Sequence, residues 1–228
     1  SKSEHSTQTA MKMMRALVLT FCLLANAAAL QYPAEEEDLQ GGLAILASPA
    51  KNATAFCVFD VDHTLTRSGG VKPADCGVAS LDSKVYGNYP GAAATQAIAQ
   101  CAARGYGVAI ATAEPRLLFN TLRKKFVEEM SGGLFDDAFD KSPAFQSSNM
   151  GSKKASYQAL AAYYDLPMNC GVVFDDAQSN LDVASALGMN TVLPSPSCKG
   201  SSLCFHACGI VPQNIVDAFA QLDKNCFT

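Results

Sequence analysis

The sequence contains no polybasic run and no basic stripe. Its 17 lysines and arginines are outnumbered by 21 aspartates and glutamates, which gives a formal net charge of -4 and a pI near 5.3. This balance offers no electrostatic footprint for nucleic acid, so we expect no nucleic-acid binding. The charged fraction is only 17%, against 49% hydrophobic residues. That composition argues against a disordered chain and favours one globular domain with a sizeable core.

Long apolar runs are absent as well. The segment MKMMRALVLTFCLLANAAAL starts with basic residues, and its apolar run extends only from Ala16 to Leu24. That is short of the roughly 20 residues that a membrane-spanning helix needs, so no stable span is expected. A basic start, a short apolar centre and small residues at the end are typical of a secretory signal peptide, here residues 11–29, cleaved after Ala27 or Ala29. An uncleaved anchor and a buried helix are the alternatives, and residues 1–10 are interpreted as leader sequence.

The cysteines lack the paired CxxC and HxxxH spacing of structural zinc sites. Nine are present, and removing the one in the signal peptide leaves eight. An even number in a secreted chain predicts disulfides, with the pairing left open. Four of the eight lie in residues 197–228, so we expect a stapled, cysteine-rich tail. Cys57 lies inside an apolar run and is expected to be a free buried thiol, and the sequon at Asn52 is open as a glycosylation site.

Short apolar runs alternate with helical patterns along residues 30–228. Strands are expected at residues 54–60, 106–112, 170–176 and 189–194, and helices at residues 90–105, 114–130, 151–165, 179–188 and 212–223. This alternation predicts a single α/β domain, a three-layer Rossmann-like core with a mostly parallel sheet.

Polar residues follow three of the expected strands, where a parallel α/β sheet binds its ligands. Asp60 and Asp62 end the first strand, Thr112 ends the second, and Asp175 and Asp176 end the third. Carboxylates that converge on one edge repel each other unless a positive charge lies between them. Oxygen ligands favour a hard cation, so the sequence predicts a Mg²⁺ site at this edge, flanked by Asp60 and Asp62.

The same segments resemble the motifs of the haloacid dehalogenase superfamily, in its phosphatase branch. FDVDHTLT resembles the first motif, a strand ending in D-x-D-x-T, and Thr112 in VAIATAE resembles the second. GSKKASYQAL resembles the third, a lysine at a helix start; Lys153 is favoured over Lys154 because Tyr157 and Leu160 follow it at helical spacing. VVFDDAQSN resembles the fourth. The motifs occur in order and span most of the chain after the signal peptide.

This resemblance implies a magnesium-dependent hydrolase of phosphate monoesters. Asp60 would be the nucleophile that forms an aspartyl-phosphate. Asp62 would act as general acid and base, with its main-chain carbonyl on the metal. Asp176 would bind the metal directly, and Asp175 would bind it directly or support a ligand. Thr112 and Lys153 would stabilise the transferred phosphoryl group, and Asn180 would orient the loop of the fourth motif. Further substrate contacts are assigned to Thr64, His63, Ala113 and Lys154. Arg67 and Arg116 could contact anionic groups of the substrate. For these two arginines and for His63, an ordinary surface position is the alternative.

Relatives with large caps insert a separate folded module, for which this chain has little room. The segment SGGVKPADCGVASLDSKVYGN, residues 68–88, is expected to form only a small flap, which Cys76 could pin. An open site suits a bulky phosphorylated substrate. The alternatives are a phosphotransferase of the same superfamily and a secreted storage or binding protein without useful turnover. The oligomeric state is left open.

Overall fold

The computed structural model of the protein describes residues 52–114, 120–131, 141–194 and 207–228. The expected signal peptide, Arg116 and the cysteines at 198 and 204 lie outside the described residues. Within the described residues, no helix has the length and apolar character that crossing a membrane requires.

A five-stranded parallel sheet forms the middle of the fold. Its strands are β1 (Phe56–Phe59), β2 (Gly107–Thr112), β3 (Phe145–Ser147), β4 (Gly171–Phe174) and β5 (Asn190–Val192), in the spatial order β3-β2-β1-β4-β5. Every residue of β1, β2 and β4 is buried, as expected for parallel strands that helices cover on both faces. The predicted α/β fold with a parallel sheet is therefore confirmed.

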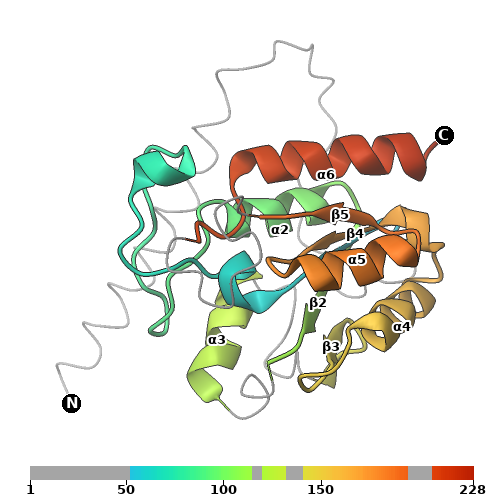
Figure 1. Ribbon diagram of the computed structural model, residues 1–228, viewed down its shortest axis with the longest axis horizontal. Helices are drawn as coiled ribbons and strands as arrows, with labels where there is room; N and C mark the ends of the chain where they lie inside the picture. Colours follow the sequence, from blue (N-terminus) through green and yellow to red (C-terminus); the bar gives the residue numbers. More distant parts are fainter. Residues whose placement is uncertain (1–51, 115–119, 132–140, 195–206) are drawn as a thin grey trace, which may run out of the picture. The chain divides into compact units, whose positions relative to one another are not determined.

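Helices form the two outer layers. They are α2 (Ala94–Ala103), α3 (Thr121–Met130), α4 (Lys154–Tyr164), α5 (Gln178–Ala186) and α6 (Pro212–Asn225). Helices α2 and α6 contact each other and cover one face of the sheet, while α4 and α5 contact each other and cover the opposite face (Figure 1). This arrangement gives the three layers that the alternating pattern predicts.

Two elements differ from the sequence-based expectation. The helix expected over residues 114–130 is described from Thr121, where the side chain of Asn120 accepts hydrogen bonds from the backbone N–H groups of Leu122 and Arg123 and caps the helix. Residues 115–119 of the expected helix lie outside the described residues. The edge strand β3 was not predicted. It is three residues long and carries Gln146 and Ser147, so it lacks the apolar run that marks a buried strand.

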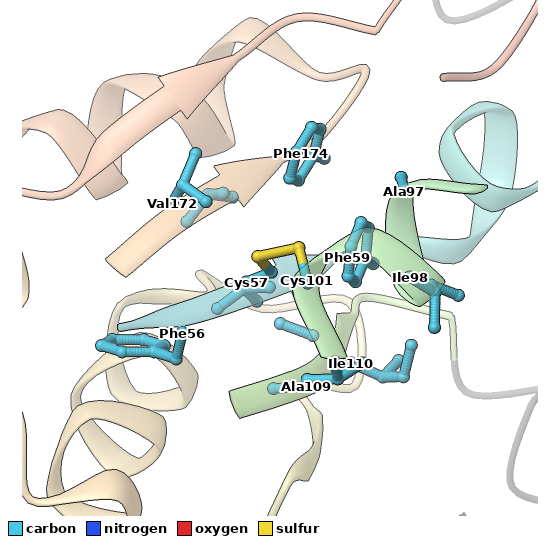
Figure 2. Packing of buried hydrophobic residues seen from close by; sticks show 14 of the residues in the cluster. Phe56, Cys57, Phe59, Ala97, Ile98, Cys101, Ala109, Ile110, Val172 and Phe174 are labelled. Carbon is cyan, nitrogen blue, oxygen red and sulfur yellow. A yellow bond between two sulfur atoms is a disulfide. The ribbon is translucent and has the colours of Figure 1, made fainter. Parts of the chain in front are cut away.

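The expectation that Cys57 is a free thiol is wrong. Cys57 in β1 forms a disulfide with Cys101 in α2, with their Cα atoms 6.5 Å apart (Figure 2). Successive side chains of a strand point to opposite faces. Phe56 stacks against Tyr164 of α4, so Cys57 points to the other face, towards α2. The disulfide thus joins the central strand to the helix layer that covers it.

Two further disulfides confirm the stapling of the described part of the tail, joining Cys76 to Cys208 and Cys170 to Cys226. Cys76 ends the 3₁₀ helix η2 (Pro73–Cys76), which lies in the flap. Apart from this helix, residues 66–93 form two isolated β-bridges and no separate module, so the small flap is confirmed. Three disulfides are typical of a protein that folds in an oxidising compartment.

The segment that begins at residue 207 packs against the loop after β1. The backbone N–H of Ile210 donates to the carbonyl of Thr64 at 3.0 Å. Gly209 makes this close approach with a φ of +66°, and a Cβ there would lie 2.7 Å from the carbonyl oxygens of Thr64 and Thr66. Glycine is required at this position, and the tail thereby holds the loop that carries Asp60 and Asp62.

Candidate active site

Asp60 and Asp175 lie side by side at the switch point of the sheet, where the connections from two neighbouring strands lead to opposite sides. From β1 the chain continues to β2 and β3 on one side, and from β4 it continues to β5 on the other. Phe59 pairs with Phe174, and the backbone N–H of Asp60 donates to the carbonyl of Phe174 at 2.9 Å. The residues after these two strands therefore meet at the switch point, where α/β sheets bind ligands.

Lys153 joins the two carboxylates. Its Nζ donates to Oδ1 of Asp60 at 2.5 Å and to Oδ2 of Asp175 at 2.7 Å, and its side chain is 1% exposed. Lys153 precedes α4, and Tyr157 lies one turn further on the buried face of that helix. The neighbouring Lys154 is exposed, so of the two candidate lysines Lys153 is the one in the site.

The acidic groups remain short of positive charge despite this lysine. Burial raises the pKa of Asp60 to about 6; Lys153 opposes the increase and the charge of Asp175 adds to it. Burial also raises the pKa of Asp176 to about 7, with the charges of Asp60 and Asp175 adding to the effect. For Lys153, burial alone would lower the pKa, but the two neighbouring carboxylates outweigh it and raise the pKa above its usual value. The ammonium is therefore held charged, whereas Asp60 and Asp176 resist ionisation.

The carboxylates of Asp60, Asp175 and Asp176 form a cluster that fits a hard divalent cation. One oxygen from each lies within 4.8 Å of the others. Asp175 is held in place by Asn180, whose Nδ2 donates to its two carboxylate oxygens at 3.0 and 3.1 Å, and by the backbone N–H of Ala177 at 3.0 Å. Carboxylate oxygens gathered in this way are the ligands that hard divalent cations take in proteins.

Asp62 directs its carboxylate away from this cluster, to Arg123. The guanidinium Nη2 of Arg123 pairs with Oδ1 of Asp62 and also with Oε2 of Glu114, at 3.1 Å from the latter. Its Nη1 donates to Oδ1 of Asn88 at 2.5 Å. Sequence analysis missed Arg123, because it carries no motif and its partners are 61, 9 and 35 residues away.

A cleft of about 550 Å³ opens above the acidic cluster. Its lining includes the predicted residues Asp60, Asp62, Thr112, Ala113, Lys153, Asp175, Asp176 and Asn180, together with Glu114, Met150 and Ala177, which were not predicted. Thr112 is buried, and its hydroxyl accepts a hydrogen bond from the backbone N–H of Glu114 at 3.1 Å. The ends of β1, β2 and β4 and the start of α4 thus all contribute to one cleft.

Other predicted residues lie elsewhere. Thr64, His63 and Lys154 are not among the residues that line the cleft. Thr64 is fully buried, and within the described residues its hydroxyl has no hydrogen-bond partner. His63 is half-buried with a φ of 55°. Arg67 donates to the carbonyl of Asp82 at 2.7 Å and stacks over Tyr89, which accounts for its side chain structurally.

No protein-family model and no curated protein matches this chain. Among solved structures, a hypothetical protein from Xanthomonas campestris is similar, with 18% sequence identity and a TM-score of 0.43, over 82% of this chain and 92% of that one. This similarity names no activity. The fold and the cleft together define a disulfide-bonded α/β protein with a lysine-bridged carboxylate cluster at its switch point.

Proposed function

We propose that this protein is a magnesium-dependent phosphatase of the haloacid dehalogenase superfamily that hydrolyses phosphate monoesters. The observation that carries the proposal is the bridge that Lys153 makes between Asp60 and Asp175, with Asp176 in the same cluster. Phosphoryl transfer depends mainly on positioning and on neutralising the charge of the transferred group. A carboxylate nucleophile, a fixed ammonium and a cation site next to each other meet that requirement.

Asp60, Asp175 and Asp176 would hold the metal. When bound, Mg²⁺ would supply positive charge that offsets the repulsion between Asp60 and a phosphate dianion. The ammonium of Lys153 would supply a second positive charge, from the protein itself, near the phosphoryl group. Thr112, at the end of the neighbouring strand, would donate its hydroxyl hydrogen to a phosphoryl oxygen.

The reaction would proceed in two displacements. In the first, a carboxylate oxygen of Asp60 bonds to phosphorus, the ester P–O bond breaks, and the carboxyl of Asp62 gives its proton to the leaving oxygen. In the second, water bonds to phosphorus, its proton passes to the carboxylate of Asp62, and the bond between Asp60 and phosphorus breaks. One ester and one water become one alcohol and one inorganic phosphate, and both aspartates return to their starting state.

The surroundings of the cleft support a large substrate and an extracellular or lumenal site of action. Within the described residues the flap is small, and a cleft of about 550 Å³ that no separate cap module covers there suits a bulky phosphorylated molecule. Three disulfides agree with the signal peptide predicted at residues 11–29, and we therefore propose secretion. N-terminal sequencing of the mature protein tests this, with Ala28 or Leu30 as the expected first residue; an intact residue 11 would contradict cleavage.

Hydrolysis of p-nitrophenyl phosphate tests the activity. The wild-type protein should release p-nitrophenol in the presence of Mg²⁺, and EDTA should abolish the release. Asp60→Asn should lower kcat by at least about 10³-fold, because the amide is a poor nucleophile. Asp223→Asn, an exposed position on α6 outside the cleft, is the matched control and should retain full activity. Equal turnover by Asp60→Asn and the wild type would remove Asp60 from the mechanism.

A further inference from the structure

Arg123 connects three segments that are distant in the sequence. Its guanidinium contacts Asp62 in the loop after β1, Glu114 in the loop after β2 and Asn88 at the end of the flap. The side chain of Arg123 is only 13% exposed, and that of Glu114 only 10%. Asn120 fixes the start of α3 by capping the backbone N–H of Arg123 itself. The arginine is therefore anchored at its backbone and at its side chain.

Within the described residues, Asp62 has no comparable support apart from Arg123. Its side chain is 42% exposed, and its backbone, with φ -72° and ψ 130°, interrupts the π-helical turn Val61–Leu65. A half-exposed carboxylate would sample several rotamers if it were not held. Proton transfer to a leaving group requires the acid within hydrogen-bond reach, and a misplacement of about 1 Å can cost about 10²-fold in rate.

We infer that Arg123 is the positioning residue for Asp62, and that it ties the orientation of Asp62 to the flap through Asn88. The inference rests on the phosphatase function proposed above. Arg123 does not line the cleft, so it acts through Asp62 rather than on the substrate. Glu114, which does line the cleft, supplies a second carboxylate for the guanidinium and helps to hold it beside Asp62.

The dependence of the rate on the leaving group tests this role. Hydrolysis of 2,4-dinitrophenyl phosphate needs little help from an acid, because the phenolate leaves without a proton, whereas β-glycerophosphate releases an alcohol that must be protonated. Asp62 also acts as the base of the second displacement, which is the same for both esters, so the comparison uses kcat/KM, which reports the first displacement. Arg123→Gln should lower kcat/KM on β-glycerophosphate by about 10²-fold and kcat/KM on 2,4-dinitrophenyl phosphate by less than about 10-fold.

Two matched variants separate positioning from general damage. Arg123→Lys keeps a cation near Asp62 and should recover part of the loss on β-glycerophosphate. Arg104→Gln removes an exposed arginine that stacks on Phe219, outside the cleft, and should leave both rates unchanged. Equal losses on the two esters in Arg123→Gln would overturn the positioning role. A wild-type protein inactive on both esters would instead overturn the proposed function, and this inference with it.

The link to the flap has its own test, which also applies if Arg123→Gln fails to fold. Asn88→Ala removes the oxygen that accepts from Arg123 and the amide that donates to the carbonyl of Tyr86. Asn88→Asp removes the same amide but keeps an oxygen acceptor for Arg123. Asn88→Ala should lower kcat/KM on β-glycerophosphate selectively, whereas Asn88→Asp should not. Identical behaviour of the two variants would contradict the link.

Discussion

Lys153 and Asp60 form a buried ion pair, with 2.5 Å between Nζ and Oδ1, although 93 residues separate them in the sequence. The same ammonium also contacts Asp175, so one cation serves two carboxylates from neighbouring strands. Such an arrangement costs desolvation free energy and is weak evidence for stability in its own right. Its position at the switch point of the sheet, beside a third carboxylate, is the basis of the proposed function.

Substitution of Lys153 should abolish activity and weaken the fold. Lys153→Met leaves two buried carboxylates without their cation, and removing one partner of a buried ion pair costs about 3–5 kcal/mol. The phosphoryl group would also lose a fixed positive charge, which should lower kcat by about 10²–10³-fold. Turnover of p-nitrophenyl phosphate and urea-induced unfolding measure the two effects.

The adjacent lysine provides the control for this experiment. Lys154 is exposed, and Lys154→Met should change neither activity nor the free energy of unfolding by a measurable amount. If Lys154→Met were the inactive variant and Lys153→Met retained turnover, the assignment of the site lysine would be reversed.

Mg²⁺ should stabilise the protein in a pH-dependent way. Because Asp60 and Asp176 have pKa values of about 6 and about 7 in the folded protein and 3.8 as the ordinary value, the metal-free folded state binds their protons more tightly than the unfolded state does. Their contribution to stability is therefore fully present below pH 4 and is lost as the pH rises through 6 and 7. Mg²⁺ competes with these protons, so its stabilising effect should grow over the same range.

Thermal unfolding with EDTA and with Mg²⁺ measures this linkage. The difference in Tm between the two conditions should be small at pH 4.5 and large at pH 7.5. Asp176→Asn should reduce the difference at pH 7.5, because it removes one carboxylate of the cluster and one of the groups with a raised pKa. A Mg²⁺-induced shift that is equal at the two pH values would contradict binding at this cluster.

The parts of the site that the sequence predicts are those coded locally. Asp60, Thr112 and Asp175 each follow an apolar strand, and the edge at which parallel strands end is a property of the fold class. Lys153 follows from helical phase, since Tyr157 continues the same buried face. These predictions need only the order of strands and helices, which the alternating pattern supplies.

The parts that the sequence did not predict depend on contacts between distant segments. Arg123 looks like any other charged residue of a surface helix, and its partners in the flap and in the loop after β1 become visible only in three dimensions. Cys57 lies within an apolar run of the sequence. The order of the strands and helices does not indicate that Cys101, in the helix that covers this strand, will face it. Side-chain pairing across layers depends on the rotation of each helix, which an apolar pattern defines only coarsely.

Asn180 should tune the affinity for metal rather than the chemical step. Its Nδ2 donates to both carboxylate oxygens of Asp175, and groups that orient a metal ligand typically change metal affinity by about 10–100-fold. Asn180→Ala should therefore raise the Mg²⁺ concentration for half-maximal activity within that range, with kcat at saturating Mg²⁺ reduced much less. Asn225→Ala, at the end of α6 and outside the cleft, should leave the Mg²⁺ dependence unchanged. A loss of kcat in Asn180→Ala that no Mg²⁺ concentration restores would assign Asn180 to the chemistry instead.

The disulfide between Cys57 and Cys101 should contribute more to stability than the one between Cys170 and Cys226. The two bridges close chain segments of similar length, with sequence separations of 44 and 56, so their effects on the unfolded chain should be nearly equal, at about 2–5 kcal/mol each. The first pair is fully buried between β1 and α2, whereas Cys226 lies at the partly exposed end of α6. Replacing Cys57 and Cys101 with alanine also removes two buried sulfur atoms, which should add about 1 kcal/mol or more to the loss. Urea unfolding of the two double-alanine variants measures the difference. An equal loss of stability in both variants would contradict the extra contribution of the buried pair. Alkylation of Cys57 in the wild-type protein, unfolded without reductant, would contradict the disulfide itself.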